Sequence, residues 1–138
     1  MPPFTTETSV RLRFQLADTT QVPADLIAAC IDDAHEEIER ALDPTVDVDT
    51  PDAGLVTGET LLAGAYLFRA LAAKDAFQQR EVTIGGQRIA AGNRFQALSS
   101  AASITEAQAW YILEPFLSPR PPRSLLASTD SMPVLGEN

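Results

Sequence analysis

The sequence predicts a mainly α-helical protein: a small bundle of about four helices with a short β-hairpin and an extended C-terminal tail. Apolar residues recur every three or four positions in several segments, which is typical of helices packed on a core. A Gly-Gly pair at 85–86 separates two short alternating runs, and prolines cluster after residue 117. Because 138 residues is a common size for one domain, we expect a helical domain over 1–117 and a tail over 118–138.

A short helix is predicted over 7–16, with Val10 and Phe14 on its buried side and Leu16 beside them. The apolar residues from 10 to 16 also alternate, so this segment fits a strand as well. The next helix is predicted over 22–42, because Pro23 suits a first turn and Asp25 lies near the positive end of the helix dipole. Its apolar positions follow one face: Ile27, Cys30, Ile31, Ala34, Ile38, Ala41 and Leu42.

A long helix is predicted from Thr57, a candidate N-cap, to about Gln79. It is apolar on nearly all sides, so we expect it at the centre of the domain. Its small residues would let neighbouring helices approach closely: Gly64, Ala65, Ala72 and Ala73. The apolar stretch 61–73 is interrupted by Arg69 and is too short to span a bilayer.

The second half predicts a hairpin over 81–89, one or two helical turns over 93–101 and a last helix from about 105 to 113 or 116. The prediction of the hairpin depends on Gly85-Gly86, which suits a tight turn. The prediction of the last helix depends on a capping-box pattern, Ser103-x-x-Glu106. Its expected apolar face is Ala109, Trp110, Ile112 and Leu113.

The negative charge is concentrated in the first half of the chain. The formal net charge is -9, and residues 1–60 hold thirteen of the 19 acidic residues but three of the 10 basic ones. Such a balance disfavours nonspecific adhesion to DNA, which requires a basic surface. The first residues lack the charged and apolar regions of a signal peptide, and a lone cysteine allows no intrachain disulfide. We therefore expect a protein made in a cytoplasm, with no membrane segment.

No catalytic constellation stands out. His35, with Asp32 and Glu39 one turn away, resembles a metal-binding helix, but the second such helix that a di-iron bundle needs is missing. We therefore expect His35 on a solvated helix face. Cys30 is expected in the core.

The pair Glu36-x-x-Glu39 resembles the first metal motif of the all-α nucleotide pyrophosphatases. Those enzymes need a further acidic pair, and the next helix offers only Glu59 and Asp75 at opposite ends, too far apart to share one ion. No serine lies in a nucleophile elbow, and Gly85-Gly86 lacks a phosphate loop's lysine. The sequence predicts a protein that is not an enzyme and needs no cofactor or metal.

One stretch resembles a known family. Val10-Arg-Leu-Arg-Phe, Val22-Pro-Ala-Asp-Leu-Ile27 and the acidic helix from Ile31 to Ile38 are similar to the opening of the head-tail connector (adaptor) proteins of long-tailed phages and gene transfer agents. In that family a second, alanine-rich helix precedes a short hairpin and a final helix, as residues 61–77, 82–89 and 105–117 do here. The resemblance covers roughly 9–117.

The resemblance implies a structural role in the virion neck. Such adaptors form a ring, generally of twelve copies, beneath the capsid portal, extend the DNA channel and dock the stopper or tail-completion protein. DNA would pass through without sequence-specific binding. The acidic residues suit a channel wall that repels phosphates, or else they only keep the subunit soluble. The candidate channel-facing residues are Asp32, Asp33, Glu36 and Glu37.

The tail after residue 117 is the candidate portal-binding segment. Its prolines favour an extended chain, two arginines lie among them, and apolar anchors follow. The residues are Pro119, Arg120, Pro121, Pro122, Arg123, Leu125 and Leu126. Two alternatives to the adaptor remain: an acidic regulatory binding module that mimics nucleic acid, and a metal-dependent nucleotide pyrophosphatase.

Overall fold

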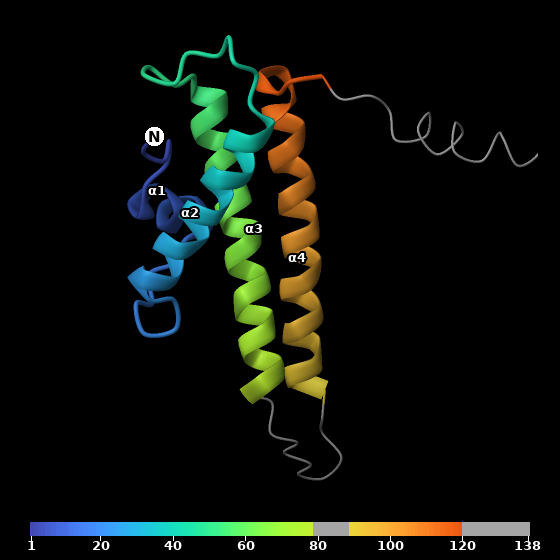
Figure 1. The fold of residues 1–138 in the computed structure, drawn as a ribbon. Helices are drawn as coiled ribbons and strands as arrows, with labels where there is room; N and C mark the ends of the chain where they lie inside the picture. Colours follow the sequence, from blue (N-terminus) through green and yellow to red (C-terminus); the bar gives the residue numbers. More distant parts are fainter. Residues whose placement is uncertain (79–88, 120–138) are drawn as a thin grey trace, which may run out of the picture.

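The computed structural model describes residues 1–78 and 89–119 (Figure 1), and this part of the chain is mainly helical, as predicted. Its four α-helices and one 3-10 turn are α1 (Glu7–Phe14), α2 (Ala24–Ala41), α3 (Ala53–Gln78), α4 (Ile89–Leu113) and η1 (Glu114–Phe116). The hairpin predicted over 81–89 lies outside the described residues, except for Ile89, which begins α4. The tail from residue 120 onward also lies outside them.

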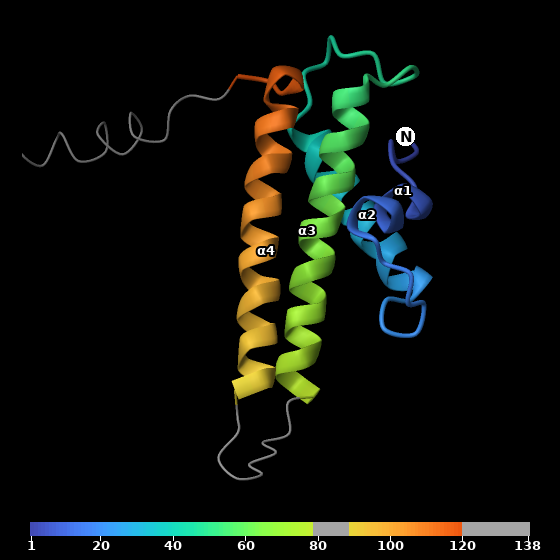
Figure 2. The ribbon, with the colours of Figure 1, turned by 180° about the vertical axis from the view of Figure 1, so that it is seen from behind.

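The helix α3 is the centre of the bundle, as its apolar composition predicted. It runs antiparallel to α4, while α2 crosses it and α1 lies on the side away from α4 (Figures 1 and 2). Each of the other three α-helices contacts α3. The helix is longer than the predicted apolar stretch and is long and apolar enough to cross a membrane, but 67% of its most apolar window is buried inside the protein. This burial is what the core helix of a helical bundle requires.

The segment that fitted both a helix and a strand is the helix α1. The Thr6 hydroxyl caps it by accepting the Ser9 N–H at 3.2 Å, and Gln15 ends it in the left-handed region at φ 56°. Val10 is fully buried and the Phe14 ring packs edge-on against Phe68, with ring centroids 5.1 Å apart. The alternation therefore did not decide the structure, because the four-residue spacing of Val10 and Phe14 matches the buried side of a helix.

The apolar face predicted for α2 is confirmed, since Ile27, Cys30, Ile31, Ala34, Ile38 and Ala41 are all buried. Burial raises the pKa of the Cys30 thiol to about 11, as suits a cysteine in the core. The N-cap predicted for α3 is wrong by five residues. The helix begins at Ala53, because the Asp52 carboxylate accepts the Gly54 N–H at 2.8 Å and takes the role expected of Thr57.

Small residues bring the helices close together at two points. A Cβ atom on Gly58 would lie 2.4 Å from the Leu113 Cγ atom of α4, and one on Gly64 would lie 2.2 Å from the Phe14 ring. The close approach predicted at Gly64 is confirmed.

The predicted break before the last helix is wrong, because α4 runs unbroken from Ile89 to Leu113. Ser103 and Glu106 lie in mid-helix, where the backbone N–H groups already have helical partners, so a capping box has nothing to cap. Glu106 instead forms an ion pair with Arg69 of α3. After η1 the chain is fixed to the end of α2: Ser118 donates its N–H to the Ala41 carbonyl at 2.9 Å.

Candidate functional site: an acidic, aromatic-lined groove

A buried polar cluster holds the N-terminal residues against α2 and α3. The Glu59 side chain is fully buried, and its Oε1 atom lies 2.6 Å from His35 Nδ1. Its Oε2 atom accepts the backbone N–H groups of Phe4 and Thr5, at 2.6 and 2.9 Å. The Thr5 hydroxyl lies 2.6 Å from the Thr60 hydroxyl. Both carboxylate oxygens of Glu59 therefore have hydrogen-bond partners within the protein, which compensates for the burial of the carboxylate.

The prediction that His35 lies on a solvated face is wrong. His35 is only 5% exposed, and the Phe4 ring packs edge-on against the imidazole, with ring centroids 4.9 Å apart. A signal for this was present in the sequence. His35 lies four residues after Ile31 and three before Ile38, so the helical period places all three on one side of α2. The pairing with Glu59 had no such signal, because Glu59 lies 24 residues from His35 and on another helix.

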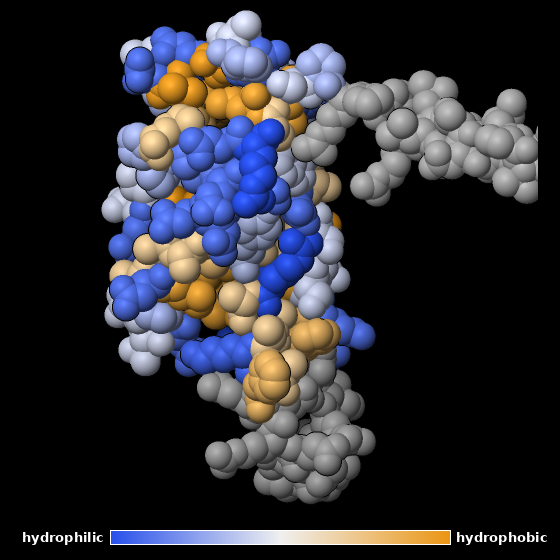
Figure 3. Space-filling model, viewed as in Figure 1, coloured by the Kyte–Doolittle hydropathy of each residue, from blue (hydrophilic) through white to orange (hydrophobic). Residues whose placement is uncertain are grey.

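The candidate channel-facing residues lie on the outer side of α2. Asp32, Asp33 and Glu36 are exposed and Glu37 is half-buried. Hydrophilic residues cover much of the surface where α2 lies (Figure 3). Arg40 partly offsets their charge, with guanidinium nitrogens 3.4 Å from Glu36 and 3.3 Å from Glu37. The four carboxylates thus form one acidic face, as the spacing of the helix predicted.

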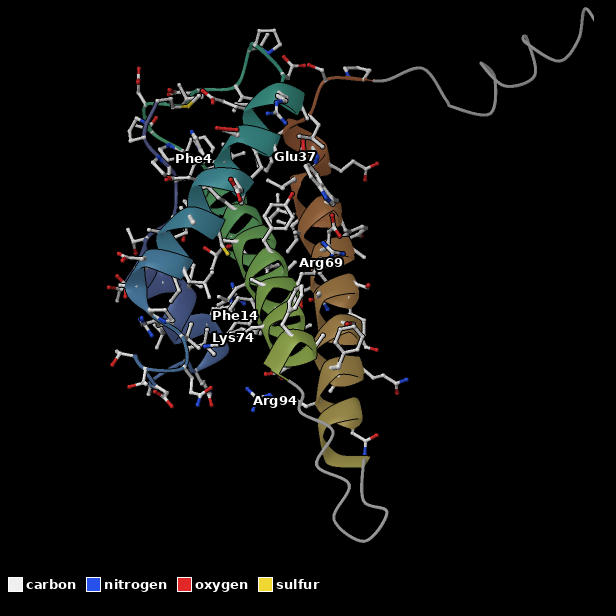
Figure 4. The ribbon with its side chains drawn as sticks, turned by 60° about the horizontal axis from the view of Figure 1, so that its bottom comes forward. Phe4, Phe14, Glu37, Arg69, Lys74 and Arg94 are labelled. Carbon is white, nitrogen blue, oxygen red and sulfur yellow. The ribbon has the colours of Figure 1, made fainter. Side chains whose placement is uncertain are left out.

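This acidic face continues into a groove where α2, α3 and α4 meet the exit of the chain. The groove has a volume of about 620 Å³. Acidic residues come from three elements and aromatic residues from two, and the chain leaves along one end: Glu37, Tyr66, Glu106, Trp110, Glu114 and Pro119. A second hollow of about 390 Å³ adjoins it, shares Glu37 and Tyr66, and includes Asp33 and Glu36. Figure 4 shows Glu37 and Arg69 on this side of the bundle.

Carboxylates surround Tyr66 in the groove. Burial, together with the charges of Glu37 and Glu106, raises the pKa of its phenol to about 12, while Arg69 opposes them. Trp110 is partly exposed beside it. An aromatic floor with carboxylates around it suits a ligand that has apolar surface and positive charge. The sequence alone missed this site, because its residues come from helices far apart in the chain.

The residues weighed for a metal or nucleotide site are not brought together. Asp75 lies 2.7 Å from the Arg94 guanidinium, and Glu59 is buried in the cluster described above. Within 1–78 and 89–119, no three histidine, cysteine, aspartate or glutamate residues are placed to hold one metal ion. The acidic pair that a pyrophosphatase needs beside Glu36 and Glu39 is therefore not formed by Glu59 and Asp75.

No family model, curated protein or solved structure matches this chain significantly.

Proposed function

We propose that this protein is a head-tail adaptor, many copies of which form a ring beneath a phage portal. The ring would extend the DNA channel and dock the stopper or tail-completion protein. The observation that supports it best is a pair of different surfaces with exposed apolar or aromatic side chains on opposite sides of the subunit. One is the outer face of α4, and the other is the outer face of α1.

The outer face of α4 has the composition of a subunit interface. Between Phe95 and Leu113 only one residue, Glu106, is charged. The exposed side includes Ser100, Ile104, Ala107 and Tyr111, with Ile104 61% and Tyr111 78% exposed. Depletion of charge and the presence of aromatic residues distinguish the centres of interfaces from ordinary surface. A helix meant only for solvent would have charged residues at these positions.

The outer face of α1 offers a different surface. Leu12 is 77% exposed and lies between two shallow hollows of about 430 Å³ each. The helices α1 and α4 lie on opposite sides of α3 (Figures 1 and 2). Joining two different surfaces of identical subunits gives a head-to-tail contact, which forms a ring when the rotation closes. Leu12 of one copy beside Ile104 and Tyr111 of the next would be such a contact.

The order of elements also supports the proposal. A short first helix, an acidic helix, an alanine-rich central helix and a final helix occur in the described residues in the order that the adaptor family implies. In a ring, the acidic face of α2 would line the channel and repel DNA phosphates, so that the duplex slides past. Ring closure by α1 and α4 would leave this face of α2 free.

Ring formation is tested by measuring the mass of the purified chain by light scattering over a range of concentrations, with electron microscopy of the largest species. We expect closed rings that bind a phage portal protein. Ile104→Glu with Tyr111→Glu should abolish the rings and leave the circular dichroism spectrum unchanged. Ala28→Glu, which adds a charge at an exposed position of α2, is the matched control and should still assemble. A chain that stays monomeric at every concentration and with the portal would contradict the proposal.

The groove, which suits a cationic partner, supports a second candidate function, an acidic binding module. This alternative predicts a stable monomer that binds one basic protein with a one-to-one stoichiometry. Light scattering separates the two functions, because only the adaptor should form rings.

A further inference from the structure

The groove between α2, α3 and α4 has the chemistry that recognises proline-rich segments containing arginine. Such segments adopt the polyproline II conformation and dock in grooves lined by aromatic side chains. Tyr66 and Trp110 supply the aromatic surface, and Glu37, Glu106 and Glu114 supply negative charge. Glu37 and Glu106 also have arginine partners, Arg40 and Arg69, whereas Glu114 is exposed at the end of the groove nearest the exit.

The chain itself contains a segment of the required kind, beginning at the last described residue. Pro119-Arg120-Pro121-Pro122-Arg123 has two prolines three residues apart and an arginine after each of its two proline blocks. Polyproline II has three residues per turn and advances about 3.1 Å per residue, so Arg120 and Arg123 would project from one side about 9 Å apart. This spacing allows the two guanidinium groups to reach two different carboxylates of the groove.

The place where the described chain ends identifies which copy supplies the segment. Ser118 is fixed to the end of α2 by hydrogen bonds to the Ala41 and Leu42 carbonyls, and Pro119 itself lines the groove. Arg120 is therefore one residue from the groove in the same subunit. Attachment this short gives a local concentration of the order of millimolar, so even a weakly binding segment is mostly docked.

We propose that the groove binds residues 119–123 of its own chain, with the prolines on Tyr66 and Trp110 and the arginines toward Glu37 and Glu114. The docking requires neither the ring nor a portal. It gives the tail a resting position on the free subunit, and a partner that takes up the tail has to compete with the groove.

Trp110 is the only tryptophan of the chain and lines the groove, so its fluorescence reports on docking. We would measure quenching by acrylamide at concentrations where light scattering shows a monomer. Arg120→Glu with Arg123→Glu should raise the quenching constant about twofold, because a tail that is mostly docked is released. The matched control, Arg13→Glu with Lys74→Glu, makes the same change of charge at exposed positions outside the groove and should leave quenching unchanged.

A charge swap shows whether the groove is the binding surface. Glu37→Arg with Glu114→Arg should raise quenching in the wild-type tail and restore protection when combined with the two arginine-to-glutamate changes. Circular dichroism verifies that each variant is folded. The wild type should also lose protection in about 1 M salt, where the Debye length is about 3 Å.

Two outcomes would overturn the proposal. Equal quenching in the wild type and the tail variant would show that the segment does not occupy the groove. Protection that grows with concentration in the variant Ile104→Glu with Tyr111→Glu, which should not form rings, would show that the tail of a second copy occupies it. Neither outcome bears on ring formation, which is judged from the mass of the assembly and from the variants of α4.

Discussion

The helices α2 and α4 pack against the same central helix, yet they differ on both their faces. The contact of α2 with α3 contains the buried pair His35–Glu59, whereas the buried residues of α4 are mostly small or apolar, such as Ala102, Ala109 and Leu113. The same contrast holds on the outside, where α2 is charged and α4 is nearly uncharged. The polar pair between α2 and α3 fixes one arrangement of α2 and the N-terminal residues, while the outer face of α4 is the surface that the ring proposal assigns to another copy.

The largest effect on stability is expected in the core that both helices share. Leu62→Asp should abolish cooperative unfolding, because Leu62 of α3 is fully buried and an unpaired buried charge costs several kcal/mol of a total stability of about 5–15 kcal/mol. Circular dichroism during heating measures this. Leu12→Asp is the matched control on an exposed position and should melt like the wild type. A normal melting curve for Leu62→Asp would contradict the central place of α3.

The substitution His35→Leu tests the buried polar pair between α2 and α3. The substitution removes one partner of a fully buried carboxylate, so we expect a loss of about 3 kcal/mol in the free energy of unfolding. Because Glu59 also holds the N–H groups of Phe4 and Thr5, amide exchange at Thr5 should quicken as well. His35→Gln, which retains a donor, should lose less. Equal losses for the two variants would show that packing, and not the hydrogen bond, is what His35 contributes.

The substitution Gly58→Ala tests the apolar contact between α3 and α4. The new Cβ atom would lie 2.4 Å from Leu113 Cγ, and such overpacking costs about 1–3 kcal/mol, against a gain in helix propensity of about 1 kcal/mol. We expect a net loss of about 1 kcal/mol in urea unfolding. In combination with Leu113→Ala the penalty of Gly58→Ala should disappear, which a double-mutant cycle measures. Strict additivity would mean that α3 and α4 can move apart here.

The smallest effect on stability is expected from the acidic face of α2. Replacing Asp32, Asp33, Glu36 and Glu37 by their amides should change the free energy of unfolding by less than about 0.5 kcal/mol, because exposed charges contribute little. The melting temperature measures this. In the adaptor proposal, particles built from this variant should assemble but package or eject DNA poorly. Fully infectious particles would leave the charge a role in solubility alone.

The sequence by itself determined the elements whose signal is local and periodic. The apolar face of α2 follows from residues three or four positions apart, a spacing that the helix imposes wherever it forms. The exposed position of Asp32, Asp33 and Glu36 followed for the same reason. The central position of α3 follows from apolar residues on nearly all of its sides. A local pattern also misled, since Ser103 and Glu106 have the spacing of a capping box within an unbroken helix.

Only the tertiary structure decided the features that join distant parts of the chain. Glu59 lies 24 residues from His35 and about twice as far from Thr5, and no periodic pattern links residues at such separations. The groove likewise combines Glu37 with Tyr66 and Trp110, three positions that meet only because α2 and α4 both pack against α3. Burial of a carboxylate is tolerated only where the fold supplies its donors, and the fold, not the neighbouring sequence, brings those donors to Glu59.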